Sequence, residues 1–324
     1  MKDFTYEGHA ISHLPEGKEW KLVWNDEFDG KELDRTKWFF RMNFWGRRFP
    51  AFTDQGVELD GESHLRLHLV KNPDGTFSSP HLQTGSLVYD IPLDNQKGEI
   101  DFPPLWPFGK KPQATFMHRF GYYEIRCRFP KNDGWHSAFW LQAPGIGSHP
   151  SAEQCGVECD VMENYRLYTE NKLVGGNIWG GYGAECRGSG HFRWDHVETP
   201  DRWHYYGVDW APDGYTFYVD GKELGRVSPD PKKFAPIYDK DHNPCGGTMT
   251  GPVSQVEQFV LVSTECHGYR SNGKCTPLLD KAVLPDYFEV DHVRVFDDVD
   301  LNKRLAARAA TGDANSSDNP VFMF

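Results

Sequence analysis

The chain has 324 residues, of which 47 are acidic and 35 are basic, so its formal net charge is −12. An acidic balance disfavours nucleic acid as a partner, because phosphate backbones are bound by basic stripes. No apolar run approaches the length of a membrane-spanning helix. We therefore expect neither a nucleic-acid nor a membrane partner.

The first half of the chain predicts strands. Short runs such as His64–Leu69 and Tyr122–Phe129 alternate apolar with polar residues, which is typical of strands with one buried face. Before them, the loop Trp45–Phe49 mixes aromatic rings with the guanidinium of Arg47, which suits binding of a sugar. The long stretch from Asp94 to Lys111 is rich in proline, and we expect it to form a rigid wall beside a cleft.

Three carboxylates interrupt the apolar run Val157–Glu163. Buried strands avoid charge unless the charge has a function. In a regular strand Glu158 and Asp160 share a face while Glu163 points away. A β-bulge at Val161–Met162 would bring Glu163 back to that face, so that all three acids line one side of the strand.

The expected spacing suits the chemistry of glycoside cleavage. With the bulge, the Cα atoms of Glu158 and Glu163 lie roughly 13 Å apart, and side chains leaning inward leave their carboxyl groups about 5 Å apart. This is the separation in retaining glycosidases, where one carboxylate attacks the anomeric carbon and the other protonates the leaving oxygen. Asp160 would hydrogen-bond to Glu158 and orient it. A solvated edge strand is the alternative, and the apolar neighbours argue against it.

Aromatic residues make up 15% of the chain, with 11 tryptophans. Indole rings stack on the C–H faces of sugars, so Trp135, Trp140 and Trp179 are candidates for the floor of a glycan cleft, with core packing as the alternative. Glu265, on a later apolar run, is a candidate for contacting sugar hydroxyls, and a structural acid is equally compatible. From Val299 to Leu305 the sequence permits a short turn or helix.

Several motifs in order resemble glycoside hydrolase family 16. The acid cluster Glu-x-Asp-x-x-Glu is preceded by Gly121–Arg126 and Gly134–Leu141. An opening strand motif lies at Trp24–Gly30, a late hairpin at Trp203–Gly221, and a closing strand at Phe288–Val295. The resemblance runs from about residue 20 to residue 296. It implies an all-β, concanavalin A-like jelly-roll β-sandwich with an open concave substrate cleft.

The resemblance also implies roles for residues. Glu158 would be the nucleophile, Asp160 its helper and Glu163 the acid/base. The spacing is similar to the bulged branch of the family, which contains laminarinases, agarases, porphyranases and carrageenases. Many members carry a histidine close to the position of Asn177. The asparagine of this chain could hydrogen-bond to a carboxylate or sugar hydroxyl, but unlike histidine it cannot carry charge. Asp291 matches a position that helps hold a structural calcium in many members. No cofactor is implied for catalysis.

We therefore expect three parts: an N-terminal extension over 1–19, a family 16-like catalytic jelly roll over 20–298, and a C-terminal tail over 299–324. The expected function is an endo-acting retaining β-glycanase acting on a β-galactan of the agar, porphyran or carrageenan type, or on a β-1,3-glucan, as a monomer. A transglycosylase on the same scaffold and a non-catalytic glycan-binding jelly roll are the alternatives. The protein would be secreted or periplasmic if a leader was removed, and cytoplasmic if Met1 is native.

Overall fold

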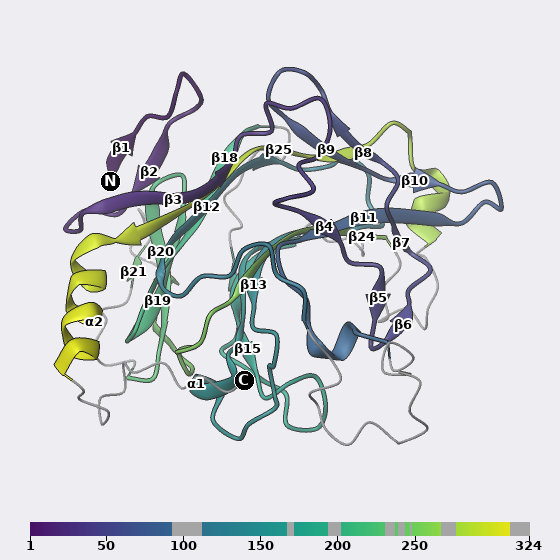
Figure 1. Ribbon diagram of the computed structural model, residues 1–324. Coiled ribbons are helices and arrows are strands. Elements are labelled where there is room, and N and C mark those ends of the chain that lie inside the picture. The colour runs from purple at the N-terminus through teal and green to yellow at the C-terminus, as the bar shows by residue number, and fades with distance from the viewer. Residues whose placement is uncertain are drawn as a thin grey trace.

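The computed structural model describes residues 1–92, 112–166, 172–193, 202–230, 237–238, 244–246, 248–266 and 277–311. Two large, mostly antiparallel sheets pack against each other as the layers of a sandwich (Figure 1). The predicted all-β sandwich is confirmed. Within the described ranges, none of the helices has the length and apolar character needed to cross a bilayer.

The ten-stranded sheet has the order β10-β11-β24-β13-β14-β15-β16, with β4 and β7 paired to β11 and β17 paired to β15. Its strands are β4 (Phe39–Phe40), β7 (Phe52–Thr53), β10 (Val70–Lys71), β11 (Phe77–Gln83), β13 (His136–Gln142), β14 (Glu158–Tyr165), β15 (Lys172–Trp179), β16 (Arg187–Gly188), β17 (Phe192–Arg193) and β24 (Phe259–Glu265).

The nine-stranded sheet has the order β23-β20-β19-β18-β12-β25-β9-β8, with β3 paired to β25. Its strands are β3 (Trp20–Asp26), β8 (Val57–Leu59), β9 (Leu65–His68), β12 (Gly121–Arg128), β18 (His204–Ala211), β19 (Gly214–Val219), β20 (Lys222–Ser228), β23 (Thr248–Thr250) and β25 (Tyr287–Asp298).

Short hairpins and helices complete the described chain. They are the strands β1 (Lys2–Phe4), β2 (Ser12–Leu14), β5 (Asn43–Phe44), β6 (Arg47–Arg48), β21 (Ile237–Tyr238) and β22 (Pro244–Gly246), the helices α1 (Ala152–Cys155) and α2 (Val299–Thr311), and 3-10 helices at Val88–Asp90 and Pro277–Lys281. Helix α2 confirms the helix expected from Val299, and it extends beyond Leu305.

The main core lies between the two sheets and follows the period of two that strands impose. On β12, Tyr123 and Ile125 enter this core, whereas Tyr122 points to the outer surface of the nine-stranded sheet. On β14, Cys159, Val161 and Met162 enter the core from the opposite layer. The remaining side chains of β14 therefore point to the side of the ten-stranded sheet that is turned away from the core.

The N-terminal hairpin β1–β2 covers part of the outer surface of the nine-stranded sheet (Figure 1). Leu14 is buried there against Tyr122, Tyr218 and Phe296. The hairpin thus closes a second, smaller apolar cluster on the far side of the sandwich from the three acids. The boundary at residue 19 remains a prediction.

Candidate active site

A bulge in β14 gathers the three acids, as the sequence predicts. Glu158 pairs with Ile178 and Asp160 with Gly176, but Glu163 pairs with Val174. Three steps along β14 thus match two steps along β15, and the extra residue lies between Asp160 and Glu163. We call the surface that these acids line, on the side of the ten-stranded sheet opposite the core, the acid face.

The carboxylate of Glu158 is held by two donors. Gln142 lies opposite it in the pairing of β13 with β14, and its Nε2 donates to Glu158 Oε2 at 2.6 Å. The hydroxyl of Tyr182 donates to the same oxygen. Burial first, and then the charge of Glu158, raise the pKa of Tyr182 well above its usual range, so this hydroxyl stays protonated and remains a donor.

Glu163 has a different environment. The hydroxyl of Tyr165 donates to Glu163 Oε1 at 2.7 Å, and His136 Nε2 lies 3.3 Å from the same oxygen. The rings of His136 and Tyr165 stack with centroids 4.3 Å apart. These two residues are directly opposite each other on β13 and β14. Asp160, between the two glutamates, is almost fully buried.

Trp140 forms the floor beside the acids. It pairs with Asp160, so its ring lies on the acid face, and its indole N–H donates to Ser263 Oγ at 3.0 Å. His81 packs against this ring at 5.8 Å, and Arg41 lies at the same distance above it. Burial, with the nearby charge of Arg41 adding to it, holds the pKa of His81 well below its usual range, so the imidazole is neutral.

Arg41 is itself buried and paired. Its Nε donates to Asp90 at 2.6 Å. Burial would lower the pKa of Arg41, but the charge and the hydrogen bond of Asp90, together with the nearby Tyr182 and Glu158, outweigh that effect and raise it. The guanidinium therefore remains a permanent positive charge near the acid face.

An exposed tryptophan, Trp45, lies next to this group. It links β5 and β6, its φ is 55°, and 46% of its surface is exposed. Its ring contacts the edge of Tyr182 at 5.5 Å and also packs on Tyr89. Arg47, the residue predicted from this loop to contact a sugar, is exposed on β6. Trp45 was missed as an individual candidate, although the aromatic composition of its loop had indicated the region.

Three predicted sugar contacts do not lie on the acid face. Asn177 is opposite Cys159, and paired residues of neighbouring strands share a face, so Asn177 points into the sandwich with the core cysteine. Trp179, two residues further, packs against the same core. Trp135 is fully buried in a separate apolar cluster with Phe77, Cys266 and others, so its ring offers no surface to a sugar.

Glu265, also predicted to contact a sugar, lies where a substrate could meet it. Glu265 pairs with His136 and is partly exposed at the end of β24, on the acid face. The stretch from Asp94 to Lys111, expected to wall the cleft, lies outside the described residues.

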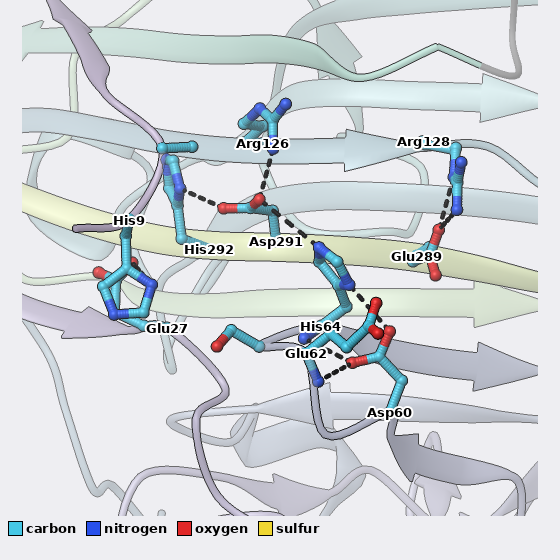
Figure 2. A network of polar contacts seen from close by, with 12 residues as sticks. His9, Glu27, Asp60, Glu62, His64, Arg126, Arg128, Glu289, Asp291 and His292 are labelled. Atoms are coloured by element: carbon cyan, nitrogen blue, oxygen red, sulfur yellow. Dashed lines mark hydrogen bonds and ion pairs between the residues drawn. The ribbon is translucent and has the colours of Figure 1, made fainter.

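Asp291 does not fit a calcium site. A second bulge, in β25, leaves both Asp291 and His292 on the outer side of the nine-stranded sheet. The Asp291 carboxylate accepts a hydrogen bond from Arg126 and contacts His292 Nδ1 at 2.9 Å (Figure 2). Burial would raise the pKa of this carboxyl, but these partners, His292 first, lower it. The oxygens that calcium would need are already used by cationic side chains.

Comparisons with known proteins identify the family of the chain. The sequence model described as Glycosyl hydrolases family 16 matches residues 59–245. A glucan endo-1,3-beta-glucosidase A1 from Niallia circulans is 26% identical over 85% of this chain and 37% of its own length. A keratan-sulfate endo-1,4-beta-galactosidase from Sphingobacterium multivorum is 24% identical over 86% of this chain and 55% of its own length. The chain therefore spans only about a third to a half of these two curated relatives.

A solved structure shares the fold. The catalytic domain of an endo-1,3-beta-glucanase (laminarinase) from Thermotoga petrophila RKU-1 superposes with a TM-score of 0.56 at 20% identity, covering 87% of this chain and 99% of that one. The jelly-roll arrangement expected from the sequence is thus also found in a solved protein.

Proposed function

The chain belongs to glycosyl hydrolase family 16, and from this premise we propose that it is an endo-acting, retaining β-glycanase. The observation that carries the proposal is the bulge of β14, which brings Glu158, Asp160 and Glu163 to one face of one strand. A purely glycan-binding sandwich has no need for such an arrangement of acids.

In the proposed reaction, Glu158 attacks the anomeric carbon of the bound sugar. The bond from that carbon to the glycosidic oxygen breaks, and Glu163 gives its proton to the departing oxygen. Water then attacks the glycosyl ester, Glu163 takes a proton from it, and Glu158 leaves as a carboxylate. Two inversions at one carbon leave its configuration unchanged. Asp160 would orient Glu158 between the two steps.

The contacts of the glutamates support these roles. Glu158 accepts hydrogen bonds from an amide and a phenol, which favour its ionised form, as a nucleophile requires. Glu163 lies against the neutral hydroxyl of Tyr165 and the imidazole of His136, two groups that tolerate a carboxyl in either protonation state.

For the substrate, we propose a β-linked polysaccharide. The two relatives named above act, by their names, on a β-1,3-glucan and on keratan sulfate, and a β-galactan or a β-1,3-glucan is accordingly our proposal for this chain. Trp140 and the exposed Trp45 offer apolar surface for sugar rings.

The test is release of reducing ends from a polysaccharide panel of laminarin, mixed-linkage glucan, agarose, porphyran, carrageenan and keratan sulfate. We expect the wild type to cut one polymer to short oligomers and Glu158→Gln to release none. The product anomer, followed by NMR in the first minutes, should keep the β configuration.

The acid/base assignment has its own control. Glu163→Ala should retain activity on an aryl glycoside with a good leaving group, and added azide should restore turnover as a β-glycosyl azide. Inactivity of the wild type on all polymers, or full activity of Glu158→Gln, would contradict the proposed function.

A further inference from the structure

The contacts of the proposed nucleophile carry an inference about the two residues that donate hydrogen bonds to it. We propose that Tyr182 and Gln142 are positioning residues that anchor one oxygen of Glu158 and help this carboxylate to leave in the second step of the reaction. This inference rests on the proposed function, because it takes Glu158 as the nucleophile.

The orientation of Gln142 is set by the backbone. The N–H of Ala143 donates to Gln142 Oε1 at 2.9 Å, so the Nε2 end of the amide is turned toward Glu158. Nε2 donates to Glu158 Oε2 at 2.6 Å and also contacts the hydroxyl of Tyr182. The Gln142 side chain is itself fully buried, which restricts its motion.

Tyr182 reaches Glu158 from the turn that follows β15. Gly180 and Gly181 precede it with φ values of 79° and 75°, a region that residues with a Cβ rarely adopt. At Gly180 a Cβ would lie 2.2 Å from the carbonyl oxygen of Glu185. The turn therefore depends on glycine, and it directs the phenol back to the acid face, where its hydroxyl donates to Glu158 Oε2.

Both donors thus meet at the same oxygen, and this has two consequences. They restrict rotation of the carboxylate, and we assign the bond to the anomeric carbon to Oε1, the oxygen that these two donors do not contact. In the covalent ester Oε2 is the carbonyl oxygen. When water displaces Glu158, the bonding pair returns to the carboxylate, and the donors on Oε2 stabilise the charge that develops.

The two chemical steps should respond differently to loss of a donor. In the first step Glu158 gives up negative charge, so removing a donor costs orientation but does not weaken the attack. In the second step Glu158 regains charge, so removing a donor raises the barrier. A purely structural role would slow both steps alike.

The test is steady-state kinetics of Tyr182→Phe on the panel polymer that the wild type cleaves fastest. Because a hydrogen bond to a charged group is lost, we expect kcat to fall about 10-fold, with KM falling alongside so that kcat/KM changes less than about threefold. Mass spectrometry of the quenched enzyme should show the glycosyl ester accumulating on the peptide that contains Glu158.

A second readout is the pH profile. With one donor fewer, the carboxylate form of Glu158 is less favoured, so the acidic limb of the kcat/KM profile should move to higher pH by about one unit. Gln142→Glu keeps an acceptor for the Ala143 N–H but replaces the donor with an acid, and it should move the limb further in the same direction.

The matched control is Tyr89→Phe. The rings of Tyr89 and Tyr182 both pack on Trp45, but only the hydroxyl of Tyr182 bonds to Glu158 in the described residues. Tyr89→Phe should have wild-type kinetics, and thermal melts should show all three variants folded.

The outcomes separate the two proposals. Full activity of Glu158→Gln would overturn the proposed function. An inactive Glu158→Gln together with wild-type kinetics and pH profile for Tyr182→Phe would overturn only the present inference. A loss in kcat/KM with no accumulated ester would also overturn it.

Discussion

Single residues on the acid face differ in what they offer a sugar. Trp140 is mostly covered, and its N–H is used by Ser263, so only part of its ring can meet a ligand. Trp45 is half exposed, and its ring packs against Tyr182, the same side chain that bonds to Glu158. Only the ring of Tyr182 would therefore separate Trp45, and a sugar stacked on it, from the proposed nucleophile.

Substitution of Trp45 tests this placement. We expect Trp45→Ala to raise KM about 10-fold with little change in kcat, because the apolar contact contributes to binding of the polymer and takes no part in the chemistry. Initial-rate measurements on the cleaved polymer check this. Trp45→Phe keeps an aromatic ring and should recover part of the loss, and an unchanged KM in Trp45→Ala would remove Trp45 from the binding surface.

Whether a residue was predicted correctly from the sequence depended on the alternation of side chains between the two faces of a strand. Trp135 and Trp140 lie five positions apart, so in a regular strand they cannot share a face. The structure places Trp135 in the separate apolar cluster with Phe77 and Trp140 on the acid face. That error was avoidable from the alternation alone. Asn177 is different, since its orientation depends on which residue of β14 it opposes, and the sequence does not contain that register.

At the scale of elements, the bulge in β14 was predictable because the acids made a regular strand implausible. Without it Glu163 would enter the core among residues such as Cys159 and Met162. The partners of the acids were not predictable in the same way. Tyr182 lies beyond the end of β15, and only the path of the turn after β15 brings its hydroxyl to Glu158.

The N-terminal hairpin allows a test of whether an element outside the acid face affects catalysis. Leu14→Ala removes a buried side chain from the cluster with Tyr122, Tyr218 and Phe296, and it should lower the free energy of unfolding by about 2–3 kcal/mol. The value of kcat should not change, because the hairpin packs on the other sheet. Urea denaturation and steady-state rates check both points.

Lys2→Ala, at an exposed position of the same hairpin, is the control and should leave stability unchanged. If Leu14→Ala reduced kcat while the protein remained folded, the two sides of the sandwich would be coupled more strongly than this packing indicates.

At the scale of the molecule, two surfaces of the described chain each gather a group of ionisable side chains. The ten-stranded sheet carries the three acids, whereas the outer side of the nine-stranded sheet carries a network of opposite charges that includes Arg126, Asp291 and His292 (Figure 2). In Figure 2, Arg128 joins Glu289 further along the same strands. The proposed chemistry belongs to the first surface, and the pH dependence of stability should arise largely from the second.

His292 is the centre of that dependence. Its ring is fully buried, with Nδ1 2.9 Å from Asp291 and Nε2 3.3 Å from Glu124. Arg294 and the ring of Tyr205 also face it, and the positive charge of Arg294 opposes protonation. Burial would lower the pKa of His292, but the hydrogen bonds to Asp291 and Glu124 raise it above the ordinary 6.5.

The sign of the effect follows from linkage. A raised pKa in the folded state means that protonated His292 stabilises the fold fully below pH 6.5, and that this contribution is lost as the pH rises through the folded-state value. The lowered pKa of Asp291 acts in the opposite direction, since its contribution is present above the ordinary 3.8 and is lost as the pH falls through the folded-state value. The combined contribution of the pair is therefore greatest between these limits.

We expect the free energy of unfolding, measured by urea titration, to decrease from pH 6.5 to pH 9 in the wild type. In His292→Gln, which keeps an amide donor for the carboxylates but does not titrate, the protein should be less stable at pH 6 and the slope above pH 6.5 should largely disappear. His191→Gln, at an exposed position, should keep the wild-type slope. If the slope persisted in His292→Gln, another group would control it, and the network of Figure 2 would be structural without being the source of the pH dependence.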